Sequence, residues 1–243
     1  MVAEAQQPTK VAKIGWFGTW SVSSIAPTFE FVKRELRALG YVEGKNIIFE
    51  FRTADNKLDR LHALADELVG LKVDLLVTPS LTAALALKNA TRTIPIVLIS
   101  QGDPIAAGLV DSLAHPGGNI TGFTSIAEVL AGKRLELLKE TVPKLSRVAV
   151  LWNPQELSSV QSWKESQLPA RELGLQLHSM EVTSADKYES AFKAAIKARS
   201  GALALMANPL AASSENHVSG MANKFRLPAM YTRRGVVENG GLM

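Results

Sequence analysis

The stretch RALG at 37–40 opens the segment that decides the fold. An apolar run to Phe51, TAD at 53–55, an amphipathic segment and DLLVTPS at 74–80 follow it, which is the order of a β-α-β unit. More than a hundred residues later the order returns, from RELG at 171–174 through SAD at 184–186 to ALALMANP at 202–209. The repeat predicts two lobes of one architecture with a small molecule held in the cleft between them. Chance similarity is the alternative, because Leu-Gly ends many helices and Ala-Asp opens many others.

The remaining chain alternates between strand-like and helix-like segments. Continuous apolar runs such as 75–78 and 96–99 are typical of strands buried on both faces of a parallel sheet. The pattern predicts an α/β fold with two doubly wound parallel-sheet lobes joined by a hinge. Residues 1–123, with 232–243 returning to them, form the expected N-terminal lobe, and residues 124–231 form the C-terminal lobe. Pro169 should kink or shorten the helix expected at 158–173.

Composition is that of a folded globular protein. Of the 243 residues 47% are hydrophobic and 21% charged, and the net charge of +4 is spread along the chain, so no nucleic-acid groove is indicated. Cysteine is absent, which excludes disulfides, thiolate metal sites and a cysteine nucleophile. No apolar stretch approaches the roughly 20 residues of a membrane-spanning helix. The polar start of the chain lacks a signal-peptide pattern and, taken alone, indicates the cytosol.

Ligands of open α/β sheets bind beyond the carboxyl ends of the strands, so the residues that follow each strand are the candidates. We expect Ser80 and Thr82, at the start of a helix, to hold a carboxylate. Asp103 is expected to face any ammonium group, and Trp16 or Trp20 to pack against an apolar or aromatic body. The full predicted set is Trp16, Thr19, Trp20, Ser80, Thr82, Gln101, Asp103, Asn153 and Asn208.

Each of these assignments has a structural alternative. Ser80 or Thr82 is about as well explained as an ordinary helix cap, and Asp103 before Pro104 as the cap of the next helix. Trp16 could be a core residue, since tryptophans are largely buried on average.

Signs of catalysis are few. The four histidines lack metal-ligand spacing, and no dinucleotide or phosphate loop is present, so we predict no catalytic group, metal or cofactor. The alternative is a two-lobed flavodoxin-like enzyme, such as an isomerase acting on a small acid. It would need a reactive pair across the cleft, and the chain offers neither paired cysteines nor a placed histidine. A third possibility, the ligand core of a transcription regulator, would need a DNA-binding module that the sequence lacks.

Several strings of this sequence resemble one family. The longest and most specific runs from Gly108 to Gly122, and the others are Leu36–Ile47, Asp59–Leu61, Leu71–Asp74, Thr93–Val97, Gly102–Pro104, Gly132–Lys139 and Val148–Pro154. All look like the substrate-binding proteins of ABC transporters, in the group that includes tryptophan- and tyrosine-type importers. The likeness covers nearly the whole chain.

The resemblance implies a type I periplasmic binding fold that closes on a small solute and performs no chemistry. The implied function is that of an extracytoplasmic solute-binding protein capturing an amino acid or aromatic acid, with a small-molecule ligand and an ABC membrane permease as partners. Ala3–Gln7 resemble the residues that follow a removed secretion signal, so we expect a periplasmic protein with an added Met1-Val2 start. Relatives usually continue beyond the position of Met243. We therefore expect uncovered strand edges and a tendency to self-associate.

Overall fold

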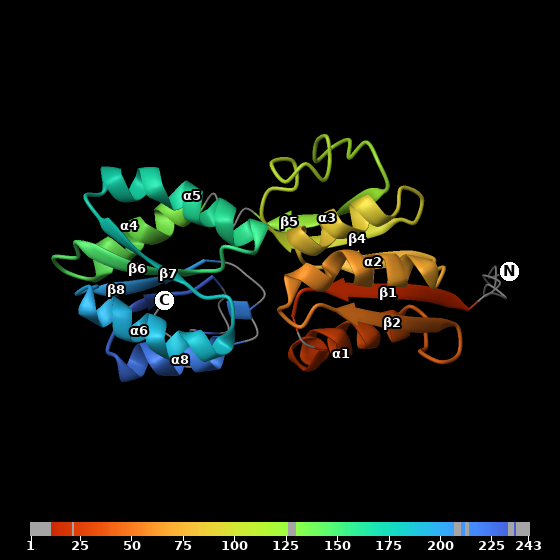
Figure 1. The fold of residues 1–243 in the computed structure, drawn as a ribbon, viewed down its shortest axis with the longest axis horizontal. Coiled ribbons are helices and arrows are strands. Elements are labelled where there is room, and N and C mark those ends of the chain that lie inside the picture. Colours follow the sequence, from red (N-terminus) through yellow and green to blue (C-terminus); the bar gives the residue numbers. More distant parts are fainter. Residues whose placement is uncertain are drawn as a thin grey trace, which may run out of the picture.

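A computed structural model describes residues 11–20, 22–125, 130–206, 210–211, 214–232 and 236. They form two α/β lobes that lie side by side (Figure 1). The N-terminal lobe contains β1 (Ala12–Gly18), α1 (Val22–Ala38), β2 (Ile47–Thr53), α2 (Leu61–Gly70), β3 (Leu75–Thr78), α3 (Leu81–Ala90), β4 (Ile96–Gln101) and β5 (Ile120–Ser125). All five strands are parallel, in the order β2-β1-β3-β4-β5.

The C-terminal lobe repeats the plan with four strands. It contains α4 (Ala131–Thr141), β6 (Arg147–Trp152), α5 (Leu157–Glu172), β7 (Gln176–Glu181), α6 (Tyr188–Lys197), β8 (Ala202–Leu205), α8 (Glu215–Lys224) and β9 (Ala229–Met230). The parallel order β7-β6-β8-β9 matches the order β2-β1-β3-β4 of the first lobe. The predicted fold class is therefore confirmed.

The sequence repeat corresponds to a repeated local structure. Gly40 and Gly174 end helices α1 and α5 with φ of +89° and +64°, a conformation that glycine adopts without a Cβ penalty. After each glycine the next amide donates to a carbonyl of the helix, from Tyr41 to Leu36 at 2.9 Å and from Leu175 to Ala170 at 2.8 Å. A short 3₁₀ turn then precedes the next helix of each lobe, at Leu58–Arg60 and at Ala185–Lys187.

Helices cover both faces of each sheet. In the first lobe α1 packs on an aromatic cluster that includes Trp16 and Phe29, while α2 and α3 cover the opposite face around Phe17 and Leu76. In the second lobe α6 and α8 cover one face, and α4 and α5 cover the other. Alternate residues along the central strands point into the two cores, which explains their continuous apolar sequences.

The structure differs from the sequence prediction at several boundaries. Helix α1 begins at Val22 rather than at residue 27, and α5 continues through Pro169 to Glu172 without being shortened. A Cβ on Gly132 of α4 would lie 2.8 Å from the Pro169 ring, so the proline lies at the α4–α5 contact. The first sheet ends at Ser125, and most of the segment expected to return to it, 232–243, lies outside the described residues. None of the described helices is long and apolar enough to cross a membrane.

Candidate functional site

Four hydroxyl side chains lie level with one another at the carboxyl edge of the first sheet. The strand register, continued past the ends of β1 and β3, aligns Thr19 and Ser80, which follow these strands, with Ser100 of β4 and Thr124 of β5. We call these residues the hydroxyl row. The first three are almost fully buried, with exposed fractions of 1%, 2% and 8%. Hydroxyls in such a row can donate to or accept from a polar solute.

The beginning of helix α5, in the other lobe, meets the hydroxyl row. Glu156 is the N-cap residue of α5 and is 2% exposed, and the Ser80 hydroxyl donates to its Oε2 at 3.2 Å. The backbone amide of Leu157 donates to Thr82 Oγ1 at 3.0 Å. The N-termini of α3 and α5 therefore adjoin between the lobes, with one carboxylate between them.

A second contact between the lobes involves Gln161 of α5 and the backbone of Asp103. The Asp103 amide donates to Gln161 Oε1, and Gln161 Nε2 donates to the Asp103 carbonyl, both at 2.9 Å. The neighbouring Gly102 has φ of +150°, and a Cβ there would lie 2.7 Å from Leu81 Cδ1 and 2.8 Å from Gln161 Oε1. The close approach of the two lobes thus requires glycine at this position.

The electrostatic environment of Glu156 is unusual for a carboxyl group. Burial raises the pKa of Glu156, because it disfavours the charged form, while the hydroxyls of Thr19, Thr82 and Ser80 lower the pKa by a smaller amount. No charged side chain of the described residues contributes to this balance. Glu156 therefore lacks a cationic partner in the described part of the chain.

Several buried polar atoms near the carboxyl edge of the sheet are without a hydrogen bond among the described residues. They include Thr19 Oγ1, Trp20 Nε1 and Ser100 Oγ. Thr19 Oγ1 lies close enough to Glu156 to influence its pKa but does not reach hydrogen-bonding geometry with it. A buried polar group left unpaired costs about 1–3 kcal/mol, so these atoms mark positions where polar atoms of a solute would be stabilised.

The structure gives the predicted residues of the first lobe different environments. Ser80 caps α3 by accepting from the Ala83 amide at 3.1 Å, in addition to contacting Glu156. The Trp20 ring covers Gly18, where a Cβ would lie 3.0 Å from it. Trp16 lies in the aromatic core, edge-on to Phe29 at 5.7 Å, and its indole Nε1 is also without a described partner.

Three further predicted residues lie around this edge. Gln101 is exposed at the end of β4, and the Asp103 carboxylate accepts from the next turn, at 2.7 Å from the Ile105 amide and 3.1 Å from the Ala106 amide. In the second lobe Asn153 is 5% exposed, and its side chain accepts from the Gln155 amide at 3.0 Å. Asn208 lies outside the described residues.

The predicted set of site residues did not include Ser100, which begins one of the stretches that follow a strand, or Glu156. Ser100 has the same strand parity as the buried Ile96 and Leu98, so the two-residue period of β4 would have selected it over Gln101. Glu156 comes four residues after the end of β6, at the start of a helix. Its only sequence signal is that position, because its burial depends on the other lobe.

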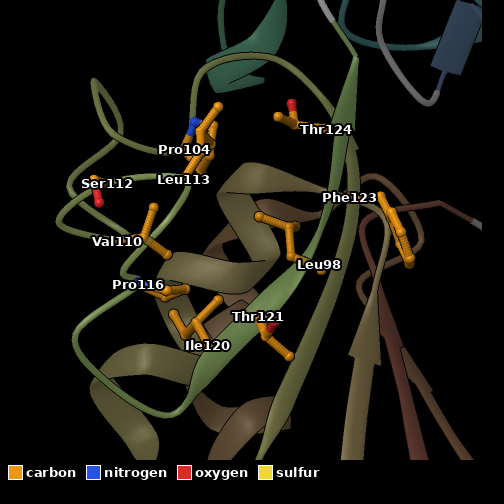
Figure 2. A pocket seen from close by; sticks show the side chains of 11 residues that line it. Leu98, Pro104, Val110, Ser112, Leu113, Pro116, Ile120, Thr121, Phe123 and Thr124 are labelled. Carbon is orange, nitrogen blue, oxygen red and sulfur yellow. The ribbon is translucent and has the colours of Figure 1, made fainter.

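A separate hollow lies on the N-terminal lobe, between β5 and the loop after β4. Figure 2 shows its apolar lining, which includes Leu98, Val110, Leu113 and Ile120. Its lining contains no charged side chain. No group of three histidine, aspartate or glutamate side chains within the described ranges is placed to hold a metal ion.

Comparison with known proteins agrees with this architecture. The model of the family described as ABC transporter substrate binding protein matches residues 21–243. A tyrosine-binding protein of Clostridioides difficile (strain R20291) is 30% identical over 212 residues, which are 87% of this chain and 60% of that protein. The chain thus spans 60% of the length of that relative.

Two solved structures are similar over almost the whole chain. A conserved domain protein from Vibrio cholerae has a TM-score of 0.83 and 29% identity, covering 96% of this chain and 77% of its own. A domain from Streptococcus pneumoniae in complex with L-Trp has a TM-score of 0.79 and 25% identity, covering 95% and 77%. The two-lobed fold and the family match together show that this chain belongs to the ABC transporter substrate binding protein family.

Proposed function

We propose that the protein is an extracytoplasmic solute-binding protein of an ABC importer that captures a small carboxylate-bearing solute between its two lobes. The observation that carries the proposal is the hydroxyl row, where buried polar atoms without partners adjoin the start of α5 from the other lobe. A solute held there would contact both lobes and so stabilise their approach. The periplasm and a membrane permease are the location and the partner that this function requires.

The solute class follows from the chemistry of the edge and from the relatives. The hydroxyls and the positive end of the helix dipole at the start of α3 favour a carboxylate, and Trp20, which follows β1, would supply an aromatic surface. One relative is named for tyrosine, and another was solved with L-Trp. We therefore propose amino acids or aromatic acids as the solutes, bound by Thr19, Trp20, Ser80, Thr82 and Ser100.

A thermal-shift screen tests this proposal. The panel contains the twenty protein amino acids, their deaminated analogues and simple aromatic acids, and binding to the folded state should raise the melting temperature by mass action. Calorimetry then gives the dissociation constant of each compound that raises it.

Mass spectrometry of the recovered compound separates binding from catalysis. We expect the compound to be unchanged after prolonged incubation with the protein. A chemically altered product would favour the enzyme alternative, and a panel without any binding compound would contradict the proposed function.

A further inference from the structure

The carboxylate of Glu156 lies where a solute is proposed to bind, and it is the feature that the proposed function leaves unexplained. Glu156 is 2% exposed and receives a hydrogen bond from Ser80 at 3.2 Å, yet no described lysine, arginine or histidine pairs with it. A buried carboxylate is costly unless it is paired as well as hydrogen-bonded. Among the described residues the negative charge of an ionised Glu156 is therefore uncompensated, and the cationic group of a bound solute can compensate it.

The hydroxyl row itself offers hydrogen-bond donors to complement this acceptor. Thr19 Oγ1 and Ser100 Oγ are buried and without a hydrogen bond among the described residues, and both can donate one. A site with one anionic acceptor and several neutral donors complements a molecule that carries both an ammonium and a carboxylate. We infer that Glu156 receives the ammonium group of the solute, so that the protein selects amino acids over carboxylates without an amine.

The inference rests on the proposed function and narrows its solute class. A plain carboxylate bound at the start of α3 would lie beside the Glu156 carboxylate, and two adjacent anions repel each other unless one takes up a proton. The residue that would exclude plain acids is therefore the same one that holds the amine.

Asp103 does not offer the same interaction. Its carboxylate is more exposed than that of Glu156 and accepts from the amides of Ile105 and Ala106, at 2.7 and 3.1 Å. These two hydrogen bonds keep the Asp103 carboxylate within the turn formed by residues 103–106. Among the described acidic residues that adjoin the hydroxyl row, Glu156 is thus the one that is buried and hydrogen-bonded to the row itself.

Matched pairs of compounds test the inference on the unmodified protein. Calorimetry compares L-tyrosine with 3-(4-hydroxyphenyl)propanoate and L-tryptophan with indole-3-propanoate, and extends to whichever amino acid and deaminated analogue bind in the screen. We expect the amino acid to bind about tenfold to a hundredfold more tightly, the range of a hydrogen bond to a charged group. Equal affinity within a pair, or binding of plain acids alone, would overturn the inference while leaving the proposed function intact.

The variant Glu156→Gln tests the residue itself, with Glu165→Gln, an exposed position on the same helix, as the matched control. The expected result is a loss of most of the preference within each pair, because the amino acid binds more weakly while its analogue does not. A merely structural effect would weaken both members of a pair equally and leave their ratio unchanged, which would count against the inference. If Glu156→Gln fails to fold, the ratio of the two affinities within each pair, measured on the unmodified protein, still tests whether the site selects amino acids.

Discussion

At the scale of single residues, Ser80 and Thr82 belong both to the fold and to the candidate site. Ser80 caps helix α3 and donates to Glu156, while Thr82 accepts from the first amide of α5. Their hydroxyls therefore contribute to helix stability, to the contact between the lobes and to the proposed carboxylate site.

Replacing both Ser80 and Thr82 with alanine should weaken binding of the solute by roughly 1–3 kcal/mol, the value of hydrogen bonds to a charged group. Loss of the cap should also lower the free energy of unfolding by about 1 kcal/mol. Calorimetry and urea unfolding measure the two effects, with the exposed Thr121→Ala as control. If affinity stays at the parental value while stability falls, the pair is only a helix cap.

Glu156 should make the stability of the ligand-free protein depend on pH. Its pKa in the folded chain lies above 4.5, the reference value for a glutamate. The folded state therefore keeps a proton that the unfolded state has released, and the free energy of unfolding falls as pH rises from 4.5 through the folded pKa. The groups facing the carboxyl are the neutral hydroxyls of Thr19, Ser80 and Thr82.

Urea unfolding of the parent and of Glu156→Gln across this pH interval provides the measurement. The stability difference between the two proteins should shift against the parent as pH rises, because glutamine does not titrate. A difference that stays constant with pH would show that the carboxyl is not perturbed.

The hydroxyl row shows how far prediction from single residues reaches. Thr19, Ser80 and Thr82 are predictable because they follow buried strands, and the structure places them together at the carboxyl edge. Ser100 could be predicted from the two-residue period of β4. Glu156 could not be predicted, because α3 and the hydroxyl row bury it and its partner Ser80 is 76 residues away in sequence.

At the scale of secondary-structure elements, the contact between α3 and α5 depends on Gly102. A side chain there would meet Leu81 and Gln161 at less than 3 Å, and the backbone has φ of +150°. The carbonyl of Gly102 also accepts a hydrogen bond from Thr124. The segment is thus fixed on both sides.

The variant Gly102→Ala should lower the free energy of unfolding by about 1–3 kcal/mol and separate the two lobes at Gln161, because the added methyl group has no room. Thermal melting measures the first effect, and small-angle scattering measures the second as a larger radius of gyration. Gly118→Ala is the control, since the methyl group that alanine adds there would have no atom within 4 Å and the φ of Gly118 is not positive. A parental radius of gyration for Gly102→Ala would contradict the close packing.

The elements themselves are largely predictable. The strands at 75–78 and 147–152 match the sequence prediction at both ends, since buried apolar runs between polar turns leave little choice. Pro169 is misleading, because a proline in the last turn of a helix removes only bonds near its end. Its ring instead packs against Gly132, a tertiary contact that local sequence does not reveal.

At the scale of the whole molecule, β5 is one of the two edge strands of the first sheet as described, with β2 at the other edge. Its Phe123 side chain is 77% exposed, and neighbouring residues of the strand are exposed as well. An apolar edge strand of this kind can pair with another chain.

We expect the protein to self-associate with rising concentration and Phe123→Glu to reduce this association, because a charge on the edge opposes pairing. Light scattering over a concentration series measures it. The control is Phe31→Glu on α1, another exposed phenylalanine at 55% exposure. A parent protein that stays monomeric at every concentration would contradict the prediction.

The adjoining N-termini of α3 and α5 also set how binding responds to ionic strength. Each helix start carries about half a positive elementary charge close to Glu156, so the two helix starts offset part of its negative charge without forming an ion pair with it. A zwitterionic solute carries its own positive and negative charges and adds no net charge to the site. Salt screens exposed charges far more than buried ones. Capture of such a solute would therefore proceed almost equally well in dilute and in saline surroundings.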